Sequence, residues 1–120
     1  MKKQFRIKKN EEFQRIIKSG KCLKNRNYVM YYSKAIEPFD RIGISVGKKS
    51  GNAVVRNKIK RQVRMILQET CDFTSGKDYV IIIRKNYDPQ QYDTNKKDLS
   101  ALYNSVYNSQ GQTFMKEIRQ

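Results

Sequence analysis

Residues 45–64 read SVGKKSGNAVVRNKIKRQVR, and this stretch decides how the rest of the chain is organised around it. Its apolar residues recur at the spacing of one face of an amphipathic helix. They are Val55, Ile59, Val63 and, just beyond the stretch, Ile66. Asn52 stands directly before this pattern, where an asparagine side chain accepts a hydrogen bond from a free N–H of the first helical turn. The sequence therefore predicts a helix that Asn52 caps and that ends at about Glu69.

The charged residues of this stretch are all basic. From Arg41 to Arg64 the chain carries eight Lys or Arg and no Asp or Glu. Arg56, Lys60 and Arg64, which we call the basic ladder, repeat every fourth residue and so lie about 6 Å apart along the helix, roughly the spacing of phosphates along a nucleic-acid strand. Like charges at this spacing repel each other by roughly 0.2–0.5 kcal/mol per pair. A solvated helix face is the alternative, but the pattern favours a polyanion as the partner of the ladder.

The composition also indicates an anionic partner. The chain has 120 residues and a net charge of +15, with a pI of about 10.0. A charge of this size indicates what the protein binds rather than how it folds. Nucleic acid is the first candidate partner, an anionic membrane surface the second and an acidic protein the third. No apolar run approaches the roughly 18 residues of a membrane-spanning helix, and residues 1–13 lack the apolar segment of a signal peptide. The sequence therefore predicts a cytoplasmic protein, in which Cys22 and Cys71 are free thiols.

Histidine is absent, which removes the usual general acid or base near neutral pH and the commonest zinc ligand. Glu11 and Glu12 stand where the first turn of a helix favours negative charge. Asp88, Asp93 and Asp98 are spread through a polar region and form no recognisable set. The sequence therefore predicts no catalytic residue, leaves any metal ligand of the protein unknown, and favours a protein that binds over one that cleaves by itself.

The segments around the basic helix predict one domain spanning residues 1–120. A first helix would begin with Asn10 as its N-cap and end with Gly20 as its C-cap. Alternating and buried apolar patterns predict three strands, at 26–33, 41–46 and 78–84. A last helix would span about 93–107, with an inner face of Leu99, Leu102, Tyr103 and Val106, before a polar, frayed tail from Ser109 to Gln120. The order α-β-β-α-β-α predicts an α+β fold, a two-layer α/β sandwich.

One face of the predicted strand 41–46 carries unusually small residues, Gly43 and Ser45. This low face either binds a ligand or makes room for a bulky neighbour such as a tyrosine, and the pattern favours neither. Tyr28, Tyr31 and Tyr32, with Phe13, leave a similar choice open. Aromatic residues on strands usually belong to the core, whereas beside a basic surface they can stack on unpaired bases, at about 1–3 kcal/mol per base.

The segment RNKIKRQVR at 56–64, preceded by KKSGNAV at 48–54, closely resembles the RNR signature of the bacterial ribonuclease P protein subunit. Four further segments resemble the same family in order and spacing. They are RIKKNEEF at 6–13, NRNYVMY at 25–31, RIGISV at 41–46 and DYVI at 78–81. The resemblance covers most of the chain and is weakest in the C-terminal third.

This resemblance implies a subunit of an endoribonuclease. Members of the family assemble with a large catalytic RNA that removes the 5′ leader from precursor tRNA. The RNA holds most of the Mg²⁺ of the holoenzyme, and the protein grips the leader, needs no cofactor and does not cleave alone. The partners implied are ribonuclease P RNA and precursor tRNA, with no DNA and no membrane. The implied fold has a left-handed crossover around the basic helix, against the usual right-handed rule.

The matching positions also imply where each RNA would bind. A cleft between the sheet and the basic helix would hold the leader, with Phe13, Val29, Tyr31, Ser45, Arg56 and Lys60. The catalytic RNA would face Lys48, Lys49, Asn57, Lys58, Arg61 and Arg64. Ile17 departs from the pattern, because many relatives carry a second aromatic residue there. Two other classes remain open: a structural RNA-binding protein, which would confer no cleavage, and an autonomous nuclease, which would need a carboxylate cluster.

Overall fold

The basic stretch forms helix α2 (Ala53–Thr70), as the sequence predicts. Asn52 caps this helix, because its side chain accepts a hydrogen bond of 3.0 Å from the N–H of Val55. The predicted apolar face is also confirmed, since Ile59 and Val63 are buried against the sheet. The same periodicity leaves the basic ladder on another face of the helix.

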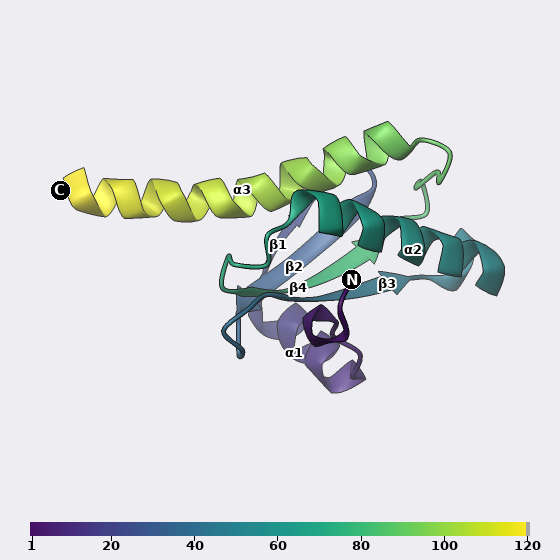
Figure 1. Ribbon diagram of the computed structural model, residues 1–120, viewed down its shortest axis with the longest axis horizontal. Coiled ribbons are helices and arrows are strands. Elements are labelled where there is room, and N and C mark those ends of the chain that lie inside the picture. The colour runs from purple at the N-terminus through teal and green to yellow at the C-terminus, as the bar shows by residue number, and fades with distance from the viewer. Residues whose placement is uncertain (120) are drawn as a thin grey trace.

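Helix α2 packs on a four-stranded sheet that has helices on both faces (Figure 1). The computed structural model describes the backbone of residues 1–119 and the side chains of residues 1–106, apart from that of Ser19. The strands are β1 (Lys21–Lys24), β2 (Tyr28–Lys34), β3 (Arg41–Val46) and β4 (Lys77–Ile83). The other helices are α1 (Asn10–Ser19) and α3 (Tyr92–Arg119), with short 3-10 turns η1 (Lys3–Phe5) and η2 (Lys48–Ser50).

The sheet has the order β1-β2-β4-β3 and is mixed. Strand β4 pairs antiparallel with β2 and parallel with β3, and β1 pairs antiparallel with β2. Two parallel strands need a crossover connection, and α2 supplies it between β3 and β4. The predicted α+β class is therefore confirmed, while the left-handed sense of the crossover stays a prediction from the resemblance.

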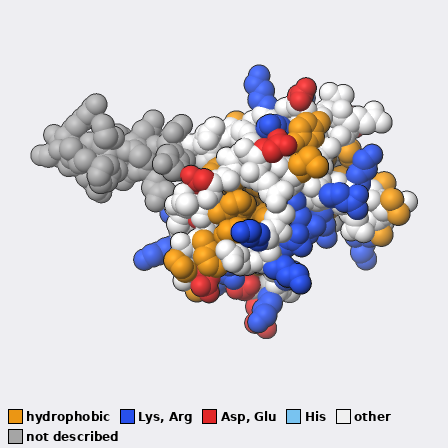
Figure 2. Space-filling view, viewed as in Figure 1, with side chains coloured by type: hydrophobic (Ala, Val, Ile, Leu, Met, Phe, Trp, Pro, Cys, Tyr) orange, Lys and Arg blue, Asp and Glu red, His pale blue; other side chains and the backbone are white. Residues whose placement is uncertain are grey.

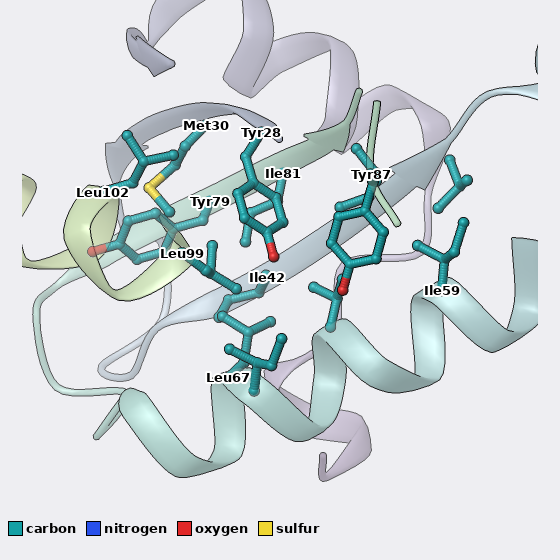
Figure 3. Close-up of a cluster of buried hydrophobic side chains, with 14 of the residues drawn as sticks. Tyr28, Met30, Ile42, Ile59, Leu67, Tyr79, Ile81, Tyr87, Leu99 and Leu102 are labelled. Carbon is teal, nitrogen blue, oxygen red and sulfur yellow. The ribbon is translucent and has the colours of Figure 1, made fainter. Parts of the chain in front are cut away.

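Alternate residues of the strands face two separate apolar clusters. Tyr28 and Met30 of β2 point into the larger cluster, which side chains of α2 and α3 complete (Figure 3). Val80 of β4 points the other way and is buried with Ile16 of α1. Helices α2 and α3 thus cover one face of the sheet and α1 part of the other.

Helix α3 buries the inner face that the sequence predicts. This face consists of Leu99, Leu102, Tyr103 and Val106, all buried. The helix continues to Arg119, so the predicted end at about Tyr107 is too early. The frayed tail predicted from Ser109 lies outside the side chains that the structure describes.

Strand β1 is the element that the sequence prediction missed. Its four residues read KCLK, and only Leu23 is turned toward the core. Lysines at both ends of a short edge strand prevent pairing with other chains, but they also conceal the alternation that identifies a strand. The predicted order therefore becomes α-β-β-β-α-β-α.

The two ends of α1 depart from the predicted capping. Asn10 is the first helical residue rather than the cap, because Lys9 stands in the cap position without a side-chain hydrogen bond. Gly20 is the C-cap as predicted, and its N–H donates to the carbonyl of Ile16 at 2.8 Å. A Cβ at this position would lie 2.5 Å from the carbonyl oxygens of Ile16 and Tyr32, so close backbone approach requires glycine here.

A polar network fixes α2 against α3 and the loop before it. The Gln62 side-chain amide donates to the carbonyl of Pro89 at 2.9 Å. Its oxygen accepts hydrogen bonds from the Tyr87 hydroxyl and, at 3.2 Å, from Asn95. Buried polar groups that are all paired hold neighbouring elements in one arrangement. Gln62 lies on the side of α2 opposite the basic ladder. Its hydrogen bonds therefore fix the rotation of the helix and, with it, the direction in which the ladder faces.

Candidate nucleic-acid interface

Phe13 projects from α1 onto β3 at the point where that strand carries its glycine. A Cβ built on Gly43 would lie 2.5 Å from Cζ of the Phe13 ring, so any side chain there would displace the ring. The sequence left open whether the small residues of β3 bind a ligand or make room for a bulky neighbour. At Gly43 the second interpretation is confirmed, because the glycine makes room for an aromatic ring. That neighbour is Phe13 rather than a tyrosine. Phe13 remains half-buried, with part of its surface open to solvent.

The register of the sheet aligns the predicted leader-binding residues of the strands in two adjacent rows. Tyr31 pairs with Val80 and Val80 with Gly43, so Tyr31 and the Phe13 ring share one row. The next row contains Val29, Ile82 and Ser45, paired in the same way, and all three are half-buried. Neighbouring strands lie about 4.8 Å apart, so each row spans roughly 10 Å. These two rows form a shallow, mostly apolar surface beside α1, which we call the floor.

The basic ladder lies along the free edge of β3. Arg6 forms an isolated parallel bridge with Ile42 at this edge, and Arg6 is close enough to Arg64 for its charge to act on it. The chain reverses between β3 and α2, so the two run in opposite directions. The ladder therefore begins with Arg56 toward the end of β3 and ends with Arg64 toward the start of β3, where Arg6 bridges to Ile42.

Burial separates the residues predicted to bind the leader from those predicted to face the catalytic RNA. The predicted leader-binding residues Arg56 and Lys60 are half-buried, like the four residues of the floor and α1. The residues predicted to face the catalytic RNA are exposed, with Arg64 as the exception. The exposed ones are Lys48, Lys49, Asn57, Lys58 and Arg61. The structure thus brings the first group toward the sheet edge and leaves the second on the outer surface of η2 and α2.

Figure 2 shows how the charge is distributed over this side of the molecule. Lys and Arg side chains gather beside the N-terminal segment and along α2, while the Asp and Glu side chains lie near α3 and at the lower edge of the view. Positive charge that is concentrated beside a groove or edge raises the local concentration of a polyanion and speeds its association. The surface along β3 therefore suits a single strand of nucleic acid, with bases toward the floor and phosphates toward the ladder.

A buried ion-pair network holds α1, and with it Phe13, in position. The Asp78 carboxylate is fully buried and accepts from Arg15 at 2.9 Å and from Arg41 at 3.2 Å. Arg41 also donates to Glu12 of α1 at 2.9 Å. Burial alone would lower the pKa of Arg41, but hydrogen bonds to Asp78 and Glu12 raise it. These pairs join α1 to β3 and β4 next to the floor.

The sequence prediction did not identify the residues of this network. Asp78 and Arg41 stand at the ends of predicted strands, and Arg15 carries no signal in the sequence. Their pairing joins segments 37 and 63 residues apart, which periodicity cannot predict. Ile82 was likewise missed as part of the floor, because it lies within a continuous apolar run that gives no sign of which face is open.

A hollow at the far end of α2 does not fit a polyanion. It is lined by Cys71 and Tyr103, with Glu69 and Asp72 at its border. The two carboxylates would repel phosphates. Burial raises the pKa of the Cys71 thiol to about 12, so this thiol stays neutral and is not a nucleophile near neutral pH. We therefore assign no function to this hollow.

The acidic residues of the polar region contribute to the structure rather than to a site. The backbone carbonyl of Asp88 accepts a hydrogen bond from the Asn95 side chain. The carboxylate of Asp98 accepts one from the Asn27 side chain. The described residues contain no group of three or more potential metal-ligating side chains. None of the helices in the described part of the chain is long and apolar enough to cross a membrane.

Comparison with known proteins gives consistent results. A family model described as Ribonuclease P matches residues 1–107. The ribonuclease P protein component of Bacillus cereus strain 03BB102 is 52% identical over 105 residues, which cover 86% of this chain and 91% of that protein.

Solved structures agree with this match. A Staphylococcus aureus RNase P protein superposes with a TM-score of 0.74 at 38% identity, covering 85% of this chain and 94% of that one. The RNase P protein from Thermotoga maritima superposes with a TM-score of 0.68 at 32% identity, covering 81% and 93%.

Proposed function

Because this chain belongs to the ribonuclease P protein family, we propose that it binds the 5′ leader of precursor tRNA along β3, between the floor and the basic ladder. The family acts in tRNA 5′ leader processing together with an RNA subunit. The chain is thus a subunit of a ribonucleoprotein endoribonuclease in which the RNA is catalytic.

The observation that carries the proposal is the arrangement of the half-buried residues. Phe13 and Tyr31 present aromatic surface in one row, and Ser45 offers a small polar side chain in the next. Arg56 and Lys60 of α2 are half-buried as well. Leaders differ in sequence, so a site for them has to rely on stacking and backbone charge rather than base-edge hydrogen bonds. The floor and the ladder provide these two kinds of contact.

Exposed basic residues of η2 and α2, together with Asn57, are proposed to bind the catalytic RNA. Their side chains are exposed, so a folded RNA can reach them. They are Lys48, Lys49, Asn57, Lys58 and Arg61, and half-buried Arg64 lies at their border. Phosphate contacts of this kind orient a protein on RNA but carry little sequence information.

The protein's part in the reaction is then to bind and orient the substrate. With one surface on the catalytic RNA and another on the leader, the protein lowers the entropy cost of bringing the scissile phosphate to the RNA. Mg²⁺ of the holoenzyme would be held mainly by the RNA, whose phosphates are hard oxygen ligands. We further propose that the protein acts in the cytoplasm, where precursor tRNA is its substrate, and that it has no DNA or membrane partner.

Lys60→Ala tests the proposed leader site. We expect it to weaken precursor tRNA binding to the holoenzyme by about tenfold, the loss of one charged contact. Binding of mature tRNA should hardly change, because only the precursor carries a leader. The measurement is equilibrium binding of both RNAs at one salt concentration. Lys97→Ala, which removes the same charge from an exposed position on α3, is the control. Equal losses for precursor and mature tRNA would refute a leader role for Lys60.

Arg61→Ala tests the proposed surface for the catalytic RNA. We expect weaker assembly with that RNA and a slope of log affinity against log salt concentration that is shallower by about one. The leader preference, taken as the ratio of precursor to mature tRNA affinity, should be retained once the holoenzyme is saturated. The slope is obtained by titrating protein into labelled catalytic RNA at several salt concentrations. An unchanged slope would show that Arg61 is only solvated.

A further inference from the structure

Three phenylalanine rings from separate segments of the chain meet at the start of β3. Phe5 of η1 stacks on Phe73, with ring centroids 4.4 Å apart and an angle of 17° between the ring planes. Phe39 meets Phe5 edge to face, with centroids 5.4 Å apart. Phe39 belongs to the loop between β2 and β3, and Phe73 to the loop between α2 and β4. We call these three residues the aromatic cluster.

The aromatic cluster lies at the surface. All three side chains are half-buried, so part of each stays open to solvent. In the described part of the chain, Phe73 is the one member of the three that packs against the larger apolar cluster. Figure 2 shows hydrophobic side chains gathered at this end of β3, on the same side of the molecule as many of the Lys and Arg side chains. An open apolar surface rimmed by polar residues is typical of a binding site.

Hydrogen bonds hold the two loops of the aromatic cluster together. Phe73 has a φ of 60°, a conformation that bulky residues seldom adopt, and its carbonyl accepts from the N–H of Asp40 at 3.0 Å. The buried Asp40 carboxylate in turn accepts from the N–H groups of Ser75 and Lys77, each at 3.0 Å. The rings are therefore held in place before any ligand arrives, which reduces the entropy that binding costs.

The aromatic cluster continues the path of the proposed leader site. The two rows of the floor are followed on the strands by a third row, which ends at Arg41 on β3. Phe39 precedes Arg41 by two residues and Gly43, in the row of Tyr31, by four. At about 3.3 Å per residue, the backbone of Phe39 lies within roughly 13 Å of Gly43, about two phosphate spacings along an extended strand. A leader that passes the floor therefore reaches the aromatic cluster about two nucleotides later.

The charge around the aromatic cluster favours RNA as its occupant. Lys2 and Lys3 are exposed and stand just before the first of the three rings. The net charge of +15 opposes the approach of a second copy of this chain. Glu37 and Asp72 are exposed neighbours of the other two rings, so the phosphates of a bound strand would lie on the side of the lysines. The rings are then left to contact a base.

We propose that the aromatic cluster binds a base of the 5′ leader about two nucleotides beyond those that lie on the floor. The proposal rests on the proposed function, which supplies the leader as single-stranded RNA. An aromatic ring can stack on any base, because every base has a π face, so the contact tolerates leaders of different sequence. The aromatic cluster would thus strengthen the binding of long leaders.

Precursor tRNAs that differ in leader length test the proposal in the assembled holoenzyme. Phe39→Leu keeps an apolar side chain but removes the ring. We expect it to weaken the binding of a precursor with a leader of about ten nucleotides by about tenfold, the loss of one stacked base. A precursor with a leader of about three nucleotides, which would not reach the aromatic cluster, and mature tRNA should bind as before.

Ile36→Ala is the matched control, because it shortens a 63% exposed aliphatic side chain of the same loop and leaves all three rings. It should bind precursors of every leader length as the unchanged protein does. If Phe39→Leu causes no loss with the long leader, or the same loss at all leader lengths, the aromatic cluster does not bind the leader and the proposal is overturned.

Two further variants separate stacking from charge and from a structural role. Phe39→Trp keeps an aromatic surface and should retain the affinity for the long leader, whereas a loss as large as that of Phe39→Leu would contradict stacking. Phe5→Leu, which removes the neighbouring ring, should act in the same direction as Phe39→Leu. Neither leucine variant should change the slope of log affinity against log salt concentration, because a ring displaces no counterions. A lower Tm together with equal losses at all leader lengths would assign the rings a structural role.

Sedimentation equilibrium of the free protein tests the rival occupant, a second copy of the chain. A dimer that Phe39→Leu abolishes, with leader affinities unchanged, would assign the aromatic cluster to self-association and overturn the proposal. Lys60→Ala judges the proposed function separately. If Lys60→Ala discriminates between precursor and mature tRNA while Phe39→Leu does so at no leader length, the aromatic cluster is refuted as a leader contact and the proposed function stands. If neither variant discriminates, both fail.

Discussion

Asp78→Asn is expected to lower the free energy of unfolding by about 3 kcal/mol, because it breaks a buried ion-pair network from its centre. Asp78 is fully buried and pairs with both Arg15 and Arg41, and the Arg41 side chain is itself only 13% exposed. An asparagine has nearly the same shape but leaves two guanidinium groups without their shared carboxylate. The measurement is urea-induced unfolding followed by far-UV circular dichroism, with the free energy extrapolated to water.

A matched change elsewhere in the network is the control. Glu12 makes one ion pair with Arg41, and its side chain is 27% exposed, so water can replace the lost contact. Glu12→Gln should therefore cost less than about 1 kcal/mol. Equal effects of the two substitutions would mean that the network does not depend on Asp78. Because the network holds α1, Asp78→Asn should also reduce affinity for precursor tRNA more than for mature tRNA in the folded fraction.

Phe13→Leu is expected to reduce the affinity for precursor tRNA by about tenfold or more, since stacking of one base on an aromatic ring contributes about 1–3 kcal/mol. Leucine keeps apolar contact with Ile16 and Val80 in the smaller cluster, so the fold should be retained. Mature tRNA, which has no leader, should bind as before. The measurement is the ratio of the two affinities in the assembled holoenzyme.

A change in the opposite direction provides the control. Ile17 lies one turn after Phe13 on α1, is half-buried, and packs against the same cluster. Ile17→Phe should raise precursor affinity, because it adds the second aromatic surface that the family resemblance leads us to expect at this position. If Phe13→Leu has no effect on the ratio, or lowers both affinities alike, Phe13 is a core residue and not a leader contact.

The elements with strong periodicity were predictable from the sequence. The basic helix, strand β3 and the inner face of α3 each repeat their apolar residues often enough to identify the element and its buried side. Strand β1 could not be found in this way, since its four residues contain two lysines and a single inward-facing leucine. The position of the cap of α1 was wrong by one residue, a precision that propensity alone does not reach.

The site was predictable only in part. Candidate RNA-binding residues could be named from charge and from the family resemblance, and the register of the sheet aligns those on the strands in two adjacent rows. The contact of Phe13 with Gly43 and the approach of Arg6 to Arg64 join residues far apart in the chain, so they depend on tertiary packing. The sequence alone could not decide whether Gly43 belongs to a ligand-binding face or makes room for an aromatic neighbour, because the answer depends on that packing.

Cleavage of precursor tRNA at low Mg²⁺ by a bacterial ribonuclease P RNA, with and without this protein, tests most directly whether the protein grips the leader. At low Mg²⁺ the RNA alone binds its substrate weakly, and a protein that grips the leader compensates for the missing metal-mediated affinity. We expect cleavage at the mature 5′ end only when RNA and protein are both present, and Lys60→Ala should reduce it. Cleavage that is equally slow with and without the protein, despite RNA binding, would contradict a leader-binding subunit.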